Sequence, residues 1–281
     1  MIGSTGAGGA TTTSKIRYLN SGAWAALSSD SAQVSAITPA EITTLTGDEI
    51  LALGTNIRFL SDASLGALTA TTCSGVCASQ IASISAAQIA VLSPAQVRMI
   101  GSTGAGGATT TSQIKLLNSG TWATLVSDPA QVAAITPAEI ATLSNNEIIA
   151  FGTNISYLSD AALGALATTT CSGSCASQIA SITAAQIVVL SPAQVGDIAG
   201  IATGYWGADT GISLLNLGTF GSLSATQVAV LTPTNVLGVT ATQLASLTET
   251  AIAGFAPATI SSFTVTQKSL LSTAQHTACG C

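Results

Sequence analysis

Apolar residues recur along this chain in pairs three residues apart, and the pairs repeat every eight residues. The pattern is clearest in the segment ASQIASISAAQIAVLSPAQVRMI. The pairs in this segment are Ile81 with Ile84, Ile89 with Leu92, and Val97 with Ile100. The apolar spacing alternates between three and five residues, whereas a half-buried strand would need a spacing of two. Each pair therefore predicts one face of a short α-helix.

Each eight-residue unit, or octad, also carries the signals of a helix start. It reads Ser or Thr, any residue, Ala, Gln or Glu, Ile or Val, any two residues, and Leu or Ile. The hydroxyl accepts hydrogen bonds from free amides as an N-cap, Pro suits the next position, and Gln or Glu three residues after the cap closes a capping box. TPAE at 38–41 and 136–139 has this signature in full, and SPAQ at 93–96 and 191–194 nearly so. The octad predicts a helix of about two turns.

Prolines prevent these helices from merging into a longer one, because each would break a continuous helix internally. They are Pro39, Pro94, Pro137, Pro192 and Pro233. Isolated helices below roughly 12 to 15 residues scarcely form in water. The helices must therefore stack, and we predict an all-α solenoid of short capped helices, with the abundant Ala and Ser at close helix contacts.

A longer repeat contains the octads. Residues 1–98 and 99–196 align without a gap, with about three quarters of their positions identical, and residues 197–281 form a diverged third copy. We take these three ranges as the units of the chain.

The opening of the chain corresponds to the middle of a repeat. Met99 and Ile100 complete a predicted helix in the second copy, so Met1 and Ile2 would begin in mid-helix. We expect the chain to be a piece of a longer array. The alternative is a start codon copied along with the repeat.

A glycine-rich loop, GSTGAGGATTTS at 3–14 and 101–112, interrupts the octads. It follows a predicted helix and lacks the Lys of a phosphate-binding P-loop, so we expect a flexible bulge. In the third copy the loop carries Tyr205, Trp206 and Asp209. These residues are a candidate contact loop for a neighbouring subunit or a glycan, although we favour packing of the aromatic rings back onto the end of the solenoid.

A second loop carries cysteines in the spacing CxxxC, as Cys73 with Cys77 and Cys171 with Cys175. A zinc site needs four ligands, but no His lies nearby, and the two pairs would be separated by several helix layers. We expect no metal and no other cofactor. Local disulfides, formed in an oxidising compartment, are the favoured interpretation.

The last two cysteines, Cys279 and Cys281, leave more alternatives open. An internal bond across one residue would be strained, so linkage to another chain is an option. His276 with these cysteines is also a candidate copper or zinc site, but a covalent tie is favoured.

Composition narrows the function classes. Only 6% of residues are charged, against roughly 25% in an ordinary soluble domain. The net charge is −6, and the basic residues form no cluster that would neutralise a nucleic-acid backbone. The mean hydropathy is +0.58, yet no apolar run approaches the roughly 18 residues of a membrane span. A single His and scattered acids argue against an enzyme.

The octads SAAQIAVLSPAQV and SATQVAVLTPTNV resemble the repeats of very large bacterial secreted or surface proteins built from LTxxQVxxL units. This resemblance implies surface display and a structural or adhesive role, with no catalytic residues. The cysteine loops and the 98-residue repeat depart from the plain form and indicate a dedicated scaffold.

Together these features favour a structural protein that associates with copies of itself in an extracellular filament, sheath or surface layer. Sparse charge permits dense packing of such copies. The alternative is a cell-surface adhesin or glycan-binding module that uses the loop around Tyr205 and Trp206.

We predict that all six cysteines are oxidised, with Cys73 joined to Cys77 and Cys171 to Cys175. A glycine near the centre of each loop lets the chain turn tightly enough to bring the two Cα atoms within the roughly 4.4 to 6.8 Å that a disulfide needs. Non-reducing peptide mapping tests this pairing. Free thiols at Cys73 and Cys77 would remove the argument for an oxidising compartment.

Overall fold

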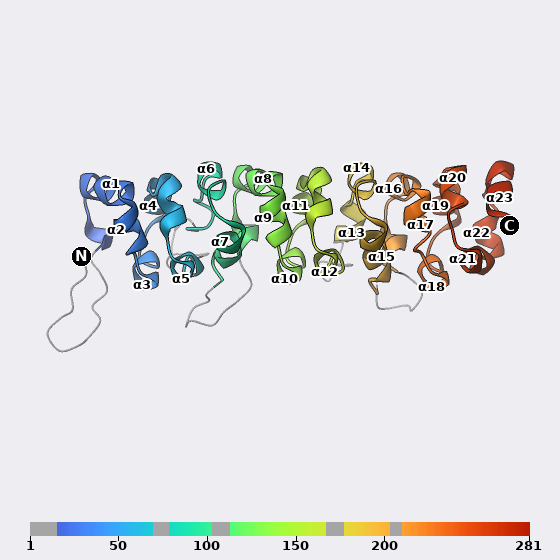
Figure 1. Cartoon of the computed structure of the whole chain (residues 1–281), viewed down its shortest axis with the longest axis horizontal. Helices are drawn as coiled ribbons and strands as arrows, with labels where there is room; N and C mark the ends of the chain where they lie inside the picture. The colour runs from blue at the N-terminus through green and yellow to red at the C-terminus, as the bar shows by residue number, and fades with distance from the viewer. Residues whose placement is uncertain (1–15, 70–78, 103–112, 167–176, 203–209) are drawn as a thin grey trace. The chain divides into compact units, whose positions relative to one another are not determined.

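The computed structural model describes residues 16–69, 79–102, 113–166, 177–202 and 210–281. This part of the chain is built almost entirely of short helices (Figure 1). Its β structure is limited to one isolated antiparallel bridge between Ala202 and Thr210. The all-α prediction is confirmed, and none of the described helices is long and apolar enough to cross a membrane.

The chain divides into two compact units, residues 1–134 and 135–281. The described helices of the first unit are η1 (Ile16–Tyr18), α1 (Ser21–Ser29), α2 (Ser31–Ser35), α3 (Pro39–Ile42), α4 (Gly47–Ala52), η2 (Gly54–Phe59), α5 (Asp62–Gly66), α6 (Ala86–Ile89), α7 (Pro94–Met99), η3 (Ile114–Leu116), α8 (Ser119–Ser127) and α9 (Pro129–Ala134), where η denotes a 3-10 helix. Here α2, η2, α6 and α8 form a series in which each helix contacts the next. A second series consists of α3, α5, α7 and α9.

The described helices of the second unit are α10 (Pro137–Ile140), α11 (Asn145–Ala150), η4 (Gly152–Tyr157), α12 (Asp160–Leu163), α13 (Gln178–Ser181), α14 (Ala184–Ile187), α15 (Pro192–Gly200), η5 (Gly211–Leu214), α16 (Leu217–Gly221), α17 (Ala225–Val228), α18 (Pro233–Val236), α19 (Ala241–Ser246), α20 (Glu249–Ile252), α21 (Pro257–Ser262), α22 (Val265–Lys268) and α23 (Thr273–Cys279).

Contacts sort the helices of the second unit into three series, which we name stacks. Stack A contains η4, α14, α16, α19 and α22; stack B contains α10, α12, α15, α17, α20 and α23; and stack C contains α11, α13, η5, α18 and α21. From α16 onward each helix contacts the third helix after it. The starts of α16, α19 and α22 lie 24 residues apart, so one layer in this region consists of three octads.

The core follows the octad. In the segment that shows the pattern best, both residues of every apolar pair are buried, with at most 4% of their surface exposed. Small residues allow close approach between layers, as we expected. Gly254 after α20 faces Ala225 of α17, and Gly221 of α16 faces Ser246 of α19, so closely that a Cβ atom on either glycine would overlap the neighbouring helix.

Capping boxes begin 13 of the 23 described α-helices. They are complete in α3, α4, α6, α7, α10, α11, α14, α15, α17, α18, α19, α22 and α23. In α10 the Thr136 hydroxyl accepts from the Glu139 amide at 3.4 Å, and the Glu139 carboxylate accepts from the Thr136 amide at 2.7 Å. The capping boxes predicted at 38–41, 93–96, 136–139 and 191–194 are confirmed.

Glutamine at the third position of the box has a second role that the octad pattern alone does not predict. In α17, Gln227 Oε1 accepts from the Ser224 amide at 2.9 Å, as the capping box requires. Its Nε2 donates to the carbonyl oxygens of Ile187 and Leu190, at 2.7 and 2.8 Å. One amide group therefore caps its own helix and binds the end of an earlier one.

This bond to earlier carbonyls recurs in both units, across sequence separations of 28 to 42 residues. The glutamines that make it are Gln80, Gln88, Gln96, Gln131, Gln178, Gln186, Gln194, Gln227, Gln243, Gln267 and Gln275. We name them the glutamine ladder. Glu41 and Glu49 hold the same place in their boxes, but a carboxylate has no proton to donate, so each closes the box only.

Asparagine and threonine at the start of other helices act in the same way. Asn118 Oδ1 caps α8 through the Thr121 amide, while its Nδ2 donates to the Ile84 carbonyl at 3.1 Å. The Thr121 hydroxyl donates to the same carbonyl at 2.7 Å. Neutral polar side chains other than glutamine thus also join the layers, through carbonyls at the ends of earlier helices.

Replacing Gln227 by Glu should keep the cap but lose both interlayer bonds. It would also place a buried carboxylate against two carbonyl oxygens, so we expect a destabilisation of about 3 kcal/mol at pH 7. Burial beside carbonyl oxygens raises the pKa of the introduced carboxyl group, so the loss should shrink below pH 5, where a protonated Glu can donate. Urea unfolding followed by circular dichroism at both pH values measures the effect.

The matched control is Glu49→Gln, which exchanges the same two groups where no interlayer bond is made. It should change the free energy of unfolding by about 0.5 kcal/mol or less. Equal effects of the two substitutions would show that the ladder does not stabilise the fold.

Thr136→Ala should destabilise by about 1 kcal/mol, because the hydroxyl is the acceptor for the Glu139 amide. Thr142→Ala serves as the control, since Thr142 is exposed and bonds only the carbonyl of the preceding turn. The midpoint of thermal unfolding is the measurement. An unchanged midpoint for Thr136→Ala would contradict the role of the box.

Candidate functional site

The structure joins Cys279 to Cys281 by a disulfide within the chain. Cys279 is the last residue of α23, and Gly280 follows it with a φ of 65°, a left-handed conformation that glycine adopts without steric cost. The Nδ1 atom of His276 lies 2.8 Å from the Cys281 carbonyl oxygen. The turn after α23 therefore brings His276 and both cysteines together.

The other sequence-predicted site residues lie outside the described part of the chain. They are Cys73, Cys77, Cys171, Cys175, Tyr205, Trp206 and Asp209. Their disulfides and the aromatic contact loop remain predictions.

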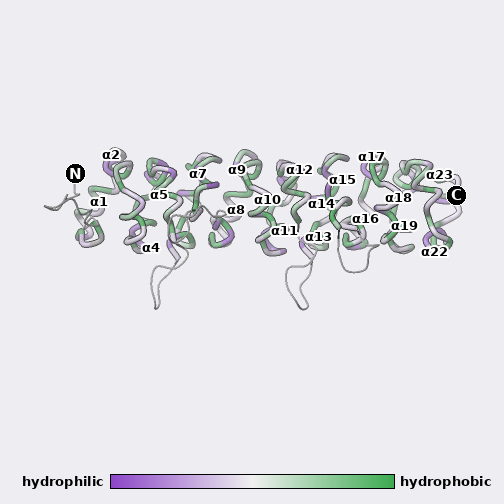
Figure 2. Tube along the Cα trace, turned by 90° about the horizontal axis from the view of Figure 1, so that it is seen from below, coloured by the Kyte–Doolittle hydropathy of each residue, from purple (hydrophilic) through white to green (hydrophobic). Residues whose placement is uncertain are grey.

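Stack A presents apolar side chains to solvent. Hydrophobic residues occur in every helical layer (Figure 2), but a subset of large ones in this stack is 37% to 88% exposed. This subset, which we name the apolar row, consists of Tyr157, Val188, Val189, Leu217, Val265 and Leu270. The row is interrupted at α19, where Thr242 is exposed instead. Its members lie in η4, α16 and α22, or directly after α14 and α22.

The row was not identified from the sequence, although a signal was present. Within an octad the apolar pair is buried, so the two residues between its members face outward. In many octads they are Ala, Ser or Thr, but in AAQIVVL they are Val188 and Val189. Large apolar residues at these outward positions mark exposed hydrophobic surface.

Exposed apolar residues also recur at equivalent positions of the first two repeat copies. Leu51 corresponds to Ile149, and Phe59 to Tyr157, each 98 residues apart and each more than a third exposed. The Arg58 guanidinium lies 4.9 Å from the centre of the Phe59 ring. The first unit therefore repeats part of the surface that the second unit shows.

Charge is unevenly distributed over the second unit. Asp160, Asp197 and Glu249 lie in stack B, where Asp160 and Glu249 are exposed. Lys268 is the one charged side chain in the described helices of stack A. The apolar row consequently crosses a surface with almost no charge to keep it hydrated.

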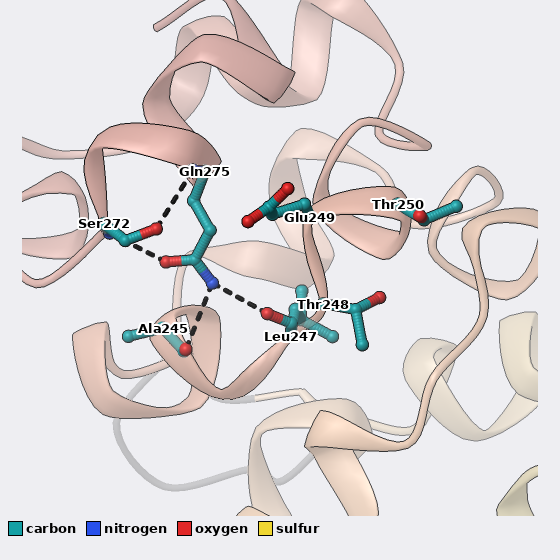
Figure 3. Close-up of a pocket in the computed structure, with 7 residues that line it drawn as sticks. All are labelled: Ala245, Leu247, Thr248, Glu249, Thr250, Ser272 and Gln275. Carbon is teal, nitrogen blue, oxygen red and sulfur yellow. Dashed lines mark hydrogen bonds between the residues drawn. The ribbon is translucent and has the colours of Figure 1, made fainter.

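A polar hollow of about 520 Å³ lies between α20 and α23 (Figure 3). It is lined by Ala245, Leu247, Thr248, Glu249, Thr250, Ser272 and Gln275. Figure 3 shows the Gln275 side chain between Ser272 on one side and the carbonyls of Ala245 and Leu247 on the other. Its Oε1 accepts from the Ser272 amide at 2.8 Å, and its Nε2 donates to the two carbonyls at 3.1 and 2.7 Å.

The chemistry available in the hollow is limited. The amide group of Gln275 already makes its hydrogen bonds within the glutamine ladder. Glu249, in the first turn of α20, is the one titratable residue that lines the hollow. A carboxylate at that position interacts favourably with the helix dipole. Among the described residues, no group of three His, Cys, Asp or Glu side chains is placed to hold a metal ion.

Among the described residues, one carboxyl group has a clearly shifted pKa. The amides of Ala32 and Gln33 donate to Asp30, and the Gln33 side chain also donates, so the pKa of Asp30 lies below its usual range. Asp30 is the N-cap of α2 and lies between α1 and α2. This shift therefore reflects helix capping rather than a catalytic arrangement.

Comparison with known proteins does not assign the chain to a family. No protein-family model matches the chain, and no curated protein matches it.

Proposed function

We propose that this protein is a structural solenoid that associates with copies of itself in an extracellular filament, sheath or surface layer. The observation that carries the proposal is the apolar row on the almost uncharged face of stack A. Exposed apolar surface of this kind marks interaction sites on proteins. The contacts of stacks A, B and C support the solenoid, because each layer repeats the placement of the one before.

The best partner for such a row is another copy of the same chain. Apolar groups that follow the spacing of the helix layers fit a surface with the same spacing, and a second copy supplies it. Two copies related by a twofold axis would bring row against row. Lys268, near one end of the row, would then lie toward Tyr157 of the other copy. Its ammonium group could make a cation–π contact with the tyrosine ring there.

The size of the row favours many weak contacts over one strong contact. Burying a half-exposed Val or Leu contributes roughly 1 kcal/mol, so the rows of two copies would supply on the order of 10 kcal/mol. Association costs an estimated 4 to 15 kcal/mol in lost freedom of motion. One row against another is therefore marginal, whereas repetition of the contact along a longer assembly would be stable, as a filament or layer requires.

An extracellular location is supported by the chemistry of the cysteines. A disulfide such as Cys279–Cys281 persists in oxidising compartments. The role is structural, and no residue is assigned to catalysis.

Val265→Glu tests the association surface. Val265 is 88% exposed at the first position of α22, where an acidic side chain suits the helix dipole, so folding should be retained. We expect the variant to associate at least tenfold more weakly than the parent in concentration-dependent sedimentation, because it places a charge in the apolar row.

Leu237→Glu is the matched control, since Leu237 is 54% exposed but belongs to stack C. It should associate like the parent. A parent protein that remains monomeric at high concentration would refute self-association, and equal weakening by both substitutions would refute the assignment to stack A.

A further inference from the structure

The disulfide after α23 is not needed to hold that helix in place. Gln275 caps α23 and binds the carbonyls of Ala245 and Leu247, and α23 contacts α20. The bond spans only one intervening residue, so it closes a very short loop and removes little entropy from the unfolded chain. Because the bond contributes so little to folding, it can be opened in a reaction while α23 stays in place.

Both cysteines are accessible to an attacking group. Cys279 and Cys281 are half-buried, and Gly280 between them is exposed. Disulfides that are strained or exposed have more oxidising potentials and are the labile ones. A ring that contains a single intervening residue is strained by its spacing alone.

We propose that Cys279–Cys281 is a thiol–disulfide exchange site whose substrate is a cysteine thiolate. The exchange is a stoichiometric reaction and is independent of the apolar row. The incoming thiolate forms a new bond to Sγ of Cys279, and the bond between Cys279 and Cys281 breaks. The electron pair leaves on Sγ of Cys281, which then takes a proton from solvent.

The surroundings of the two sulfur atoms select Cys281 as the leaving group. Cys279 lies at the C-terminal end of α23, where the helix dipole disfavours a thiolate, and its Sγ is 3.6 Å from the carbonyl oxygen of His276. Cys281 lies beyond the helix, with the His276 ring against its carbonyl. The helix dipole therefore favours the thiolate on Cys281 over the thiolate on Cys279, and the thiol of lower pKa leaves faster.

Reduced glutathione is the probe for the reaction. The folded protein is treated with it, quenched with acid, alkylated and digested with trypsin, which cuts after Lys268 and releases the peptide beginning at Ser269. We expect a glutathione adduct on Cys279, at least tenfold more abundant than any adduct on Cys281.

The matched control is Cys281→Ser, which removes the disulfide while keeping the ladder bonds of Gln275. It should retain the parent's circular dichroism spectrum and form no adduct with reduced glutathione, because no disulfide remains to be attacked. If reduced glutathione does not open the disulfide of the parent protein, the proposal is wrong. A predominant adduct on Cys281 would overturn the assignment of the leaving group.

Discussion

The fold depends on an amide side chain that satisfies two backbone ends at once. A helix leaves its first four amides and last four carbonyls without partners, so in helices of four to six residues such as α14, α17 and α19 almost every backbone group is an end group. Buried backbone groups without partners are costly. Most members of the glutamine ladder meet this constraint as Gln227 does, whose Oε1 accepts from the cap of α17 while its Nε2 donates to a carbonyl of α14.

This constraint also accounts for the composition. A carboxylate only accepts and an ammonium only donates, so neither can replace glutamine in the ladder. The same holds for Asn118, whose amide both caps α8 and bonds to an earlier carbonyl. A chain that joins its layers in this way needs Gln, Asn, Ser and Thr, and its 6% of charged residues follows. Low charge in turn leaves the solvent face of stack A with little to oppose contact between copies.

Local rules were enough to predict capped helices from the octads, because caps and apolar pairs lie within one octad. The predicted length of about two turns was too long, since most of the described octad helices have four to six residues. Thr136 and Glu139 are three residues apart, and their hydrogen bonds depend on nothing outside α10. The carbonyls that Gln227 binds lie 37 and 40 residues earlier, so they follow only from knowing which helices stack. The Cys279–Cys281 pairing does not follow from the sequence for a different reason: the spacing permits an internal bond and a bond to another chain alike.

The ladder also explains how the chain accommodates insertions. In the third copy successive helices of stack A begin 24 residues apart, but η2 and α6 of the first unit begin 32 residues apart and still contact each other. The additional residues include 70–78, with Cys73 and Cys77, and they lie between octads. Gln88 nevertheless bonds to Ile50 just as Gln227 bonds to Ile187. Because the interlayer bonds come from the octads, the segments between octads are free to differ, and the cysteine and aromatic sequences lie in those segments. The cysteine sequences of the first two copies and the aromatic sequence of the third thus lie apart from the residues that stabilise the layers, whereas Cys279 ends an octad helix, α23.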